Sequence, residues 1–240
     1  MKSSKGKINL TWLGHSAFKI ESPTGKIILI DPWLDNPNAP ANAKDIPRVD
    51  IILVSHGHSD HIGNTIEIAK RTNAKVLTIY ELSLYFESQG VSNVVGFGKG
   101  GSVDIEGIRV SMVDARHSGG IETSSGQILL GDAAGFVVKL ENGFVLYHAG
   151  DTSLFGDMKF IEKLHNPHVA LLPIGGLYTM GPREAAIACD LIKPKFIIGM
   201  HYGTFPALAG TPQQLKKYLH TKMKSRVVEL RPGEVKSFPR

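Results

Sequence analysis

The stretch Ser-His-Gly-His-Ser-Asp-His at residues 55–61 decides how the rest of this 240-residue sequence is interpreted. It follows the mostly apolar run Val49–Val54, which is typical of a buried strand. Sites in α/β proteins are built at the carboxyl ends of strands, and imidazole and carboxylate groups bind zinc and similar divalent ions. The stretch therefore predicts a metal site rather than a solvated polar loop, with four ligands: His56, His58, Asp60 and His61.

Three later residues of the same chemical type also follow strand-like runs. His117 follows the run 107–115, Asp151 follows the run 144–147, and His201 follows the run 196–200. Strands that end at one edge of a sheet sandwich would bring these side chains together with the residues of the first stretch. We therefore expect one site that draws on the whole length of the chain.

Strand-like and helix-like runs alternate in an order that favours two packed sheets. The helix-spaced run Ile62–Arg71 precedes the strand-like run Lys75–Ile79, which predicts a parallel pair with Val49–Val54. Later elements are predicted as helices at Phe155–Leu164, Arg183–Leu191 and Thr211–Met223, and as strands at Val169–Pro173, Phe196–Met200 and Val227–Leu230. A β-rich half with a helix or two, repeated once, indicates two sheets with helices outside. No shift in composition divides the chain, so we expect one α/β domain over residues 1–240.

The composition excludes several classes of protein. Hydrophobic residues make up 42% and charged residues 20%, which is ordinary for a globular protein and excludes disorder and coiled coil. The one cysteine, Cys189, excludes a disulfide framework and a cysteine-rich metal site, and its place in an apparent helix predicts a core residue. The polar, basic segment Met1–Ile8 lacks a signal core, and no run reaches 18 apolar residues. We therefore expect a cytoplasmic protein with no membrane partner.

The order of ligands resembles that of the metallo-β-lactamase superfamily of metal-dependent hydrolases, over about residues 8–235. The resemblance implies a four-layer αββα sandwich and two divalent metal ions, with Zn²⁺ favoured over Mn²⁺, Fe²⁺ or Ni²⁺. Carried over residue by residue, it implies one ion held by His56, His58 and His117, a second held by Asp60, His61 and His201, and Asp151 bridging both. Two such ions can share a hydroxide nucleophile and stabilise developing negative charge. Asp60 and Asp151 are then the catalytic carboxylates, with Asp60 suited to orienting the hydroxide.

Departures from other members of this superfamily narrow the chemistry. Redox members of the flavodiiron type usually have Glu where this sequence has His58, so the redox branch is not favoured. Many β-lactamases use a cysteine in the second metal site and lack a counterpart of His61, so antibiotic hydrolysis is not favoured either. The segments Thr11–Phe18, Ile28–Pro32 and Leu172–Gly176 look like the branch of ascorbate-phosphate lactonase-like proteins, especially its short members. The resemblance therefore supplies a class of reaction and no particular substrate.

Residues outside the ligand set have several readings. Asp31 is predicted to support a metal-bound histidine by accepting its second N–H, the alternative being a turn cap. His15 is a further supporting candidate, although lining the pocket and a purely structural role stay open. His148 is better explained by a structural role at a strand end. Substrate contacts are expected from Tyr178, Thr179 and Tyr202.

These observations favour hydrolysis of an ester-type bond, such as a lactone, phosphoester or thioester, in a small anionic substrate. The net charge of +5 suits anions and keeps open a phosphodiesterase or nuclease acting on nucleic acid, which is less favoured. A non-catalytic metal-binding domain that senses a ligand is the alternative from another class. A homo-oligomer is compatible with the sequence.

Overall fold

Two β-sheets face each other in the computed structural model, which describes residues 6–124 and 126–238. The first sheet has the order β15-β1-β2-β3-β4-β5-β6. Its strands are β1 (Ile8–Trp12), β2 (Phe18–Glu21), β3 (Ile27–Ile30), β4 (Ile51–Leu53), β5 (Lys75–Ile79), β6 (Val94–Phe97) and β15 (Val235–Phe238). The second sheet has the order β14-β13-β12-β11-β8-β7. Its strands are β7 (Ser102–Ile105), β8 (Ile108–Asp114), β11 (Ala134–Lys139), β12 (Val145–His148), β13 (Val169–Pro173) and β14 (Phe196–Met200).

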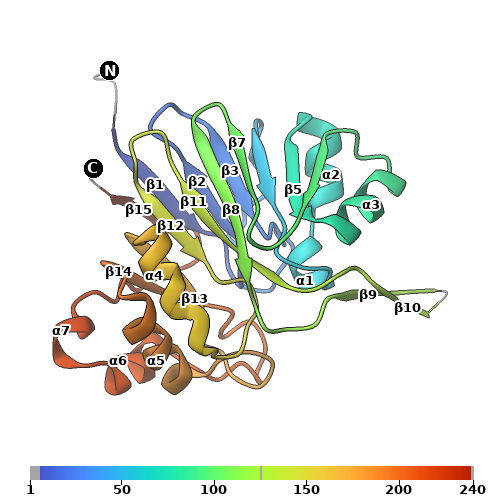
Figure 1. Ribbon diagram of the computed structural model, residues 1–240. Coiled ribbons are helices and arrows are strands. Elements are labelled where there is room, and N and C mark those ends of the chain that lie inside the picture. Colours follow the sequence, from blue (N-terminus) through green and yellow to red (C-terminus); the bar gives the residue numbers. More distant parts are fainter. Residues whose placement is uncertain (1–5, 125, 239–240) are drawn as a thin grey trace.

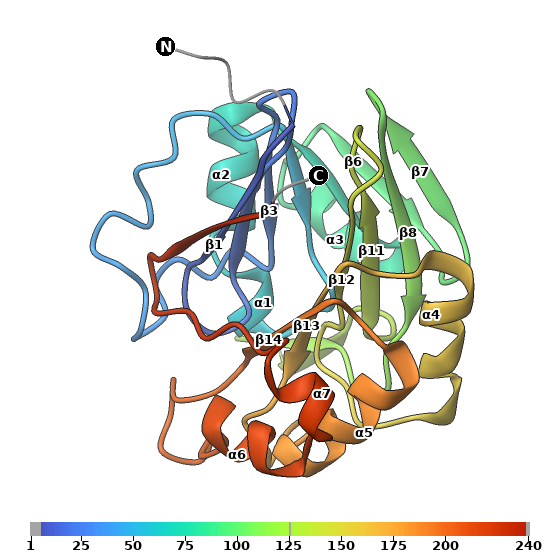
Figure 2. The same ribbon diagram turned by 90° about the vertical axis from the view of Figure 1, so that its left-hand side faces the viewer.

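Helices cover the outer faces of both sheets (Figures 1 and 2), which gives the predicted αββα arrangement. The first sheet carries α1 (Ser59–Ile62), α2 (Thr65–Thr72) and α3 (Tyr80–Ser88). The second carries the 3-10 turn η1 (Gly156–Met158) and the helices α4 (Lys159–His165), α5 (Pro182–Ile192), α6 (Pro212–Tyr218) and α7 (Thr221–Lys224). Among the described residues, none of the helices combines the length and apolar character that crossing a membrane requires.

Parallel strands in both sheets direct their carboxyl ends to one edge of the sandwich. Strands β3 to β6 pair in parallel, as do β12 to β14. Every residue of β4 is buried because a helix layer covers one face and the second sheet the other. Burying each of its Ile and Leu side chains contributes roughly 1.5–3 kcal/mol. This core fixes the positions of the loops that follow the strands.

Two predicted helices are interrupted in the structure. The run Ile62–Arg71 is divided between α1 and α2 because Gly63, at φ 43°, ends the first helix. The run Thr211–Met223 was predicted as one helix, but the extended backbone of Leu219 separates α6 from α7. The expected start of α6 is confirmed, since the Thr211 hydroxyl accepts the Gln214 N–H at 3.2 Å.

The C-terminal strand prediction is wrong in position. Of the run Val227–Leu230, only Val227 makes an isolated bridge, with Ile197, and the terminal strand is β15 instead. β15 pairs antiparallel with β1 and carries the polar residues Lys236 and Ser237, so its sequence lacks the apolar signal of a buried strand. The first five residues, Ser125 and the last two residues of the predicted 1–240 domain lie outside the described residues.

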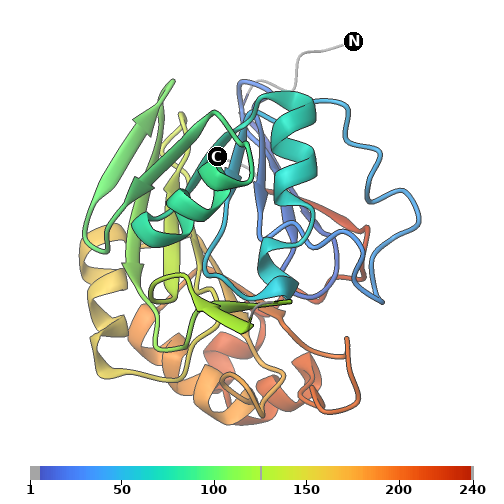
Figure 3. The same ribbon diagram turned by 90° about the vertical axis from the view of Figure 1, so that its right-hand side faces the viewer.

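A small hairpin extends from the body of the molecule (Figures 1 and 3). It consists of β9 (Gly120–Thr123) and β10 (Gly126–Leu129), paired antiparallel. Its base packs closely on the loop after β4: a Cβ placed on Gly57 would lie only 2.8 Å from the Cβ of Leu130. Glycine at residue 57 therefore allows the hairpin to contact the segment that carries His56 and His58.

Candidate metal centre

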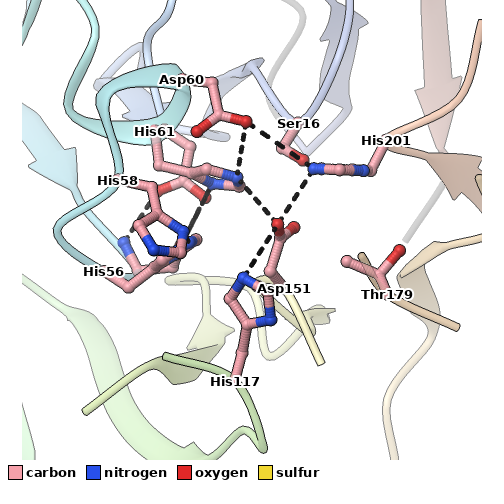
Figure 4. A network of polar contacts seen from close by, with 12 residues as sticks. Ser16, His56, His58, Asp60, His61, His117, Asp151, Thr179 and His201 are labelled. Carbon is pink, nitrogen blue, oxygen red and sulfur yellow. Dashed lines mark hydrogen bonds and ion pairs between the residues drawn. The ribbon is translucent and has the colours of Figure 1, made fainter. Parts of the chain in front are cut away.

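Four loops at one edge of the sandwich deliver the candidate ligands (Figure 4). The segment after β4 and the start of α1 carry His56, His58, Asp60 and His61, which the tight spacing keeps together. The other three follow β8, β12 and β14: His117, Asp151 and His201. The structure thus brings together all seven residues that the sequence predicted as metal ligands.

Three histidines form a first cluster. Ring nitrogens of His56, His58 and His117 lie within 4.8 Å of one another. The His56 Nε2 is 3.0 Å from the His58 Nδ1, and the His117 ring stands nearly perpendicular to both other rings. The hydroxyl of Ser55 lies 2.9 Å from the His56 Nδ1. This contact directs the Nε2 of His56 towards its neighbours, as a metal ligand requires.

A second cluster surrounds the carboxylate of Asp60. Ligand atoms of His15, Asp60, His61 and His201 lie within 4.8 Å of one another. The Asp60 Oδ2 is 3.9 Å from the His61 Nε2 and 3.8 Å from the His201 Nε2. This group contains the three residues predicted for the second ion, together with His15.

Asp151 lies between the two clusters. Its Oδ2 is 3.3 Å from the His61 Nε2 and 2.9 Å from the His201 Nε2, on the side of the second cluster. The same oxygen is 3.7 Å from the His117 Nε2, on the side of the first. The turn before it requires glycine, because Gly150 has φ 62° and a Cβ there would collide with the carbonyl of Ala134.

The buried carboxylate of Asp31 supports His61. Its Oδ2 is 2.7 Å from the His61 Nδ1 and accepts the Ser55 hydroxyl at 2.7 Å, while its Oδ1 accepts the Ser55 N–H at 2.7 Å. A carboxylate at Nδ1 keeps a proton there and leaves the Nε2 lone pair for a metal. The placement agrees with the supporting role predicted for Asp31.

The buried ring of His15 contacts Asp60 directly. Its Nε2 is 3.0 Å from the Asp60 Oδ2 and its Nδ1 is 2.8 Å from the Thr204 hydroxyl. Its ring lies between Trp33, at 5.1 Å, and His201, at 4.0 Å, measured between ring centroids. His15 thus holds one oxygen of Asp60 in place.

His148 has a structural position on β12. Its Nε2 donates to the Ser16 carbonyl at 3.0 Å, and its Nδ1 accepts the Gly150 N–H at 3.1 Å. The ring therefore links β12 to the N-terminal loop and fixes the turn that presents Asp151. This is the strand-end role that the sequence favoured.

The three predicted substrate contacts lie in different surroundings. Thr179 is drawn in Figure 4 on the same side of Asp151 as His201, and the exposed Tyr178 precedes it. The ring of Tyr202 instead stacks on Trp12 with centroids 5.2 Å apart and lines a groove with Thr211 and Glu229. The structure therefore does not bring Tyr202 to the ligand cluster.

Two polar residues of the site were not predicted. Ser55 is the first residue of the stretch 55–61, and its position before His56 was the signal for it in the sequence. Thr204 contacts His15 across 189 positions of chain, and a pattern of local spacing carries no information about such a contact.

The cluster holds its histidines in two protonation states. Burial lowers the pKa of His56, His58 and His117, and the nearby carboxylates do not offset it. Burial also acts on His61 and His201, but Asp151 and the other carboxylates outweigh it and raise both pKa values, that of His201 to about 9. The first cluster is therefore neutral and ready to bind a cation, whereas the second holds protons that a cation must displace.

The donor set fits metal ions. Among the described residues, the buried Asp151 Oδ1 has no hydrogen-bond partner and the buried His61 Nε2 has only the Asp151 Oδ2, 3.3 Å away, although leaving such a group unsatisfied costs about 1–3 kcal/mol. The surrounding histidines hold the pKa values of Asp60 and Asp151 below the usual range against the opposing effect of burial. Ionised carboxylates and imidazoles at such spacing suit zinc and the neighbouring divalent transition metals.

The two-sheet sandwich thus gathers histidine and aspartate clusters at one edge, where its strands end. A family model described as "Beta-lactamase superfamily domain" matches residues 9–201, so the chain belongs to the beta-lactamase superfamily. The chain is also 46% identical over 228 residues to a UPF0173 metal-dependent hydrolase of Koribacter versatilis, covering 95% of this chain and 97% of the relative. A UPF0173 metal-dependent hydrolase of Methanosarcina barkeri is equally similar, at 46% over 228 residues with the same coverage.

A solved structure extends the similarity to three dimensions. Igni18, described as a novel metallo hydrolase from the archaeon Ignicoccus hospitalis, superposes with a TM-score of 0.87 at 34% identity, covering 98% of this chain and 99% of that chain. Together these relatives confirm the predicted superfamily and the αββα fold. The protein is a metal-dependent hydrolase.

Proposed function

We propose that this hydrolase cleaves an ester-type bond, in a lactone, phosphoester or thioester, with two divalent ions held side by side. The observation that carries the proposal is the position of Asp151. One oxygen of this carboxylate lies within 3.7 Å of histidine nitrogens from both clusters, as a bridging ligand requires. We further propose zinc as the metal, a small-molecule substrate and a cytoplasmic location.

The candidate residues would hold the two ions, and Asp60 would also orient water. The first ion would be held by His56, His58 and His117, the second by Asp60, His61 and His201, with Asp151 shared. When bound, such ions supply a hydroxide near neutral pH and polarise the carbonyl or phosphoryl group under attack. The Asp60 side chain is 27% exposed and that of Asp151 only 3%, so Asp60 is the carboxylate that reaches solvent. Asp60 can therefore orient an incoming water, while His15 fixes the angle of the carboxylate.

The test is metal-dependent turnover by purified protein loaded with Zn²⁺ or Mn²⁺. Hydrolysis of a small lactone and of bis(p-nitrophenyl) phosphate would be measured alongside metal content. Asp151→Ala should lose bound metal and activity together, while His220→Ala, at an 81% exposed side chain outside the site, serves as the control. Full activity of Asp151→Ala with wild-type metal content would contradict the proposal.

A phosphodiesterase acting on nucleic acid is the second candidate, favoured by the net charge of +5 and the exposed Lys217, Lys222 and Lys224 of α6 and α7. It requires an affinity for RNA or DNA that falls steeply with salt, because phosphate contacts release counterions. Binding that is insensitive to salt would remove this candidate. Two bound metals with no turnover of either substrate would favour the non-catalytic sensing alternative.

A further inference from the structure

Large apolar side chains are exposed on three segments that meet at the metal centre. The hairpin carries Ile128 and Leu129, the loop after β13 carries Leu177 and Tyr178, and the loop after β14 carries Phe205. A single exposed apolar residue needs no explanation, but several that surround a functional site indicate a binding surface. We call these five residues the apolar rim.

Each rim segment is anchored to the backbone beside a candidate ligand. The hairpin base lies on Gly57, between His56 and His58. The loop after β13 begins at Gly175, where a Cβ would collide with the His201 carbonyl. It ends where the Met180 N–H donates to the carbonyl of Thr152 at 3.0 Å, next to Asp151.

Phe205 lies on the same side as Asp60. Its ring centroid is 6.1 Å from that of His15 and 6.0 Å from that of Trp33. Since His15 contacts Asp60, the Phe205 ring lies one residue away from the carboxylate that reaches solvent. A substrate that approaches Asp60 therefore meets these aromatic rings.

Leu177 combines a strained backbone conformation with an exposed side chain, in a turn held by the hydrogen bonds Gly176 N–H to the Met180 carbonyl and Tyr178 N–H to the Gly176 carbonyl. Its φ of 58° lies in the left-handed region, which is unfavourable for a residue with a branched side chain. Its side chain is 71% exposed, so burial in the folded chain does not offset this strain. Contact with a ligand would supply the missing burial.

The basic side chain next to the candidate ligands in sequence is held by other groups. Arg116, next to His117 in sequence, lies with its Nε 3.8 Å from the Asp114 Oδ2 and its guanidinium 5.2 Å from the Phe155 ring. Within the part of the chain that the structure describes, no lysine or arginine forms an ion pair with Asp60 or Asp151. Among the described residues, the apolar rim rather than a paired cation therefore lies beside the candidate carboxylates.

We infer that the apolar rim binds a hydrophobic acyl or aryl group of the substrate, so that this hydrolase prefers esters with a medium or long apolar chain. The inference rests on the proposed ester hydrolysis. The apolar rim would contact the part of the substrate that lies outside the bond being cleaved.

The test compares chain lengths at a constant reactive group. For zinc-loaded protein, kcat/KM would be measured with p-nitrophenyl acetate, butyrate and octanoate. Binding of acetohydroxamate and octanohydroxamate, which share a metal-binding group, would be measured by calorimetry. Full burial of a methylene is worth about fourfold in affinity, so half burial of six methylenes predicts a gain of about 60-fold for the octanoyl chain.

Leu177→Ser should reduce the octanoate-to-acetate ratio by about threefold to tenfold in both measurements. Leu164→Ser on α4 is the matched control, because Leu164 is also 71% exposed and lies away from the ligand loops. We expect the control to keep the wild-type ratio. Equal effects of the two variants would overturn the inference.

Three further outcomes separate this inference from its alternatives. Stronger binding of octanohydroxamate without hydrolysis of any ester would refute the proposed reaction and leave the apolar subsite standing. Hydrolysis with no dependence on chain length would refute the subsite and leave the reaction. Sedimentation of both variants decides whether the rim instead joins two copies of the chain: a dimer that Leu177→Ser dissociates, with an unchanged chain-length ratio, would overturn the inference.

Discussion

Replacing Asp31 by asparagine tests how the protein prepares His61 for a metal. Three donors converge on this carboxylate: the Ser55 N–H, the Ser55 hydroxyl and the His61 Nδ1–H. Asparagine keeps the shape but offers one acceptor oxygen and one NH₂ group. If the oxygen accepts the fixed Ser55 N–H, the NH₂ group faces the His61 Nδ1, which must then become an acceptor. The His61 proton moves to Nε2 and occupies the lone pair that points towards Asp151.

The expected effect is a loss of metal affinity larger than the loss of stability. Disturbing a group that supports a metal ligand lowers affinity by about 10–100-fold, which is about 1.4–2.8 kcal/mol. The assay is competition with a chromophoric zinc chelator at pH 7.5, with thermal unfolding recorded on the same samples. We expect one ion to be held as in the wild type and the second to be weakened.

Asp50→Asn provides the matched control at the opposite end of the parallel pair β3–β4: Asp31 follows β3 and Asp50 precedes β4. The Asp50 Oδ2 accepts the Ile27 N–H at 2.8 Å, as the Asp31 Oδ1 accepts that of Ser55, but no histidine is involved. This variant should lower the Tm and leave both metal affinities unchanged. Wild-type zinc affinity in Asp31→Asn, or an equal loss in the control, would refute the reasoning about the tautomer.

The remaining predictions concern pH, His15 and the turn before Asp151. Because the pKa of His201 is raised to about 9, zinc affinity of the second cluster should rise with pH up to about 9, roughly tenfold per unit for each displaced proton. The zinc affinity of the first cluster, whose histidines have lowered pKa values, should not change with pH above 6.5. Chelator competition at three pH values measures this difference in pH dependence between the two clusters. Thr204→Val removes the partner of the His15 Nδ1 and should lower kcat more than it changes KM, with metal content intact; loss of metal would show that His15 acts on the ions instead. Gly150→Ala introduces a Cβ at positive φ against the Ala134 carbonyl and should destabilise the fold by more than about 1 kcal/mol, a fall in Tm of at least roughly 2–4 °C in thermal unfolding.

The gathering of the seven candidate ligands could be predicted because local spacing and strand ends carry most of its information. His56, His58, Asp60 and His61 share one short segment, so their proximity hardly depends on the rest of the fold. His117, Asp151 and His201 each follow a strand, and the sheets place those strand ends together. The position of Asp31 near these residues could be predicted in the same way, because Asp31 follows β3, the neighbour of β4 in the sheet.

Contacts between distant segments could not be predicted in this way. The pairing of His15 with Asp60 depends on the loop between β1 and β2, and that of His15 with Thr204 depends on the loop after β14. Tyr202 follows His201 directly, yet the backbone turns so that its ring stacks on Trp12. The break at Leu219 has a similar cause, since helical spacing continues through a residue whose backbone is extended.

The backbone at the metal centre shows why these particular side chains meet. His15, Asp31 and His201 have φ values of 50°, 46° and 54°, in a region that costs roughly 1–2 kcal/mol for a residue other than glycine. In extended backbone, successive side chains point to opposite faces, and the left-handed conformation breaks this alternation where a strand passes into its loop. At each of these three positions the side chain joins the charged network: Asp31 contacts His61, His15 contacts Asp60, and His201 contacts Asp151. Strain concentrated at such residues persists only where the surrounding contacts hold it, and here those contacts are the ones that preorganise the ligands. The local conformations that weaken the fold are therefore the same ones that build its metal centre.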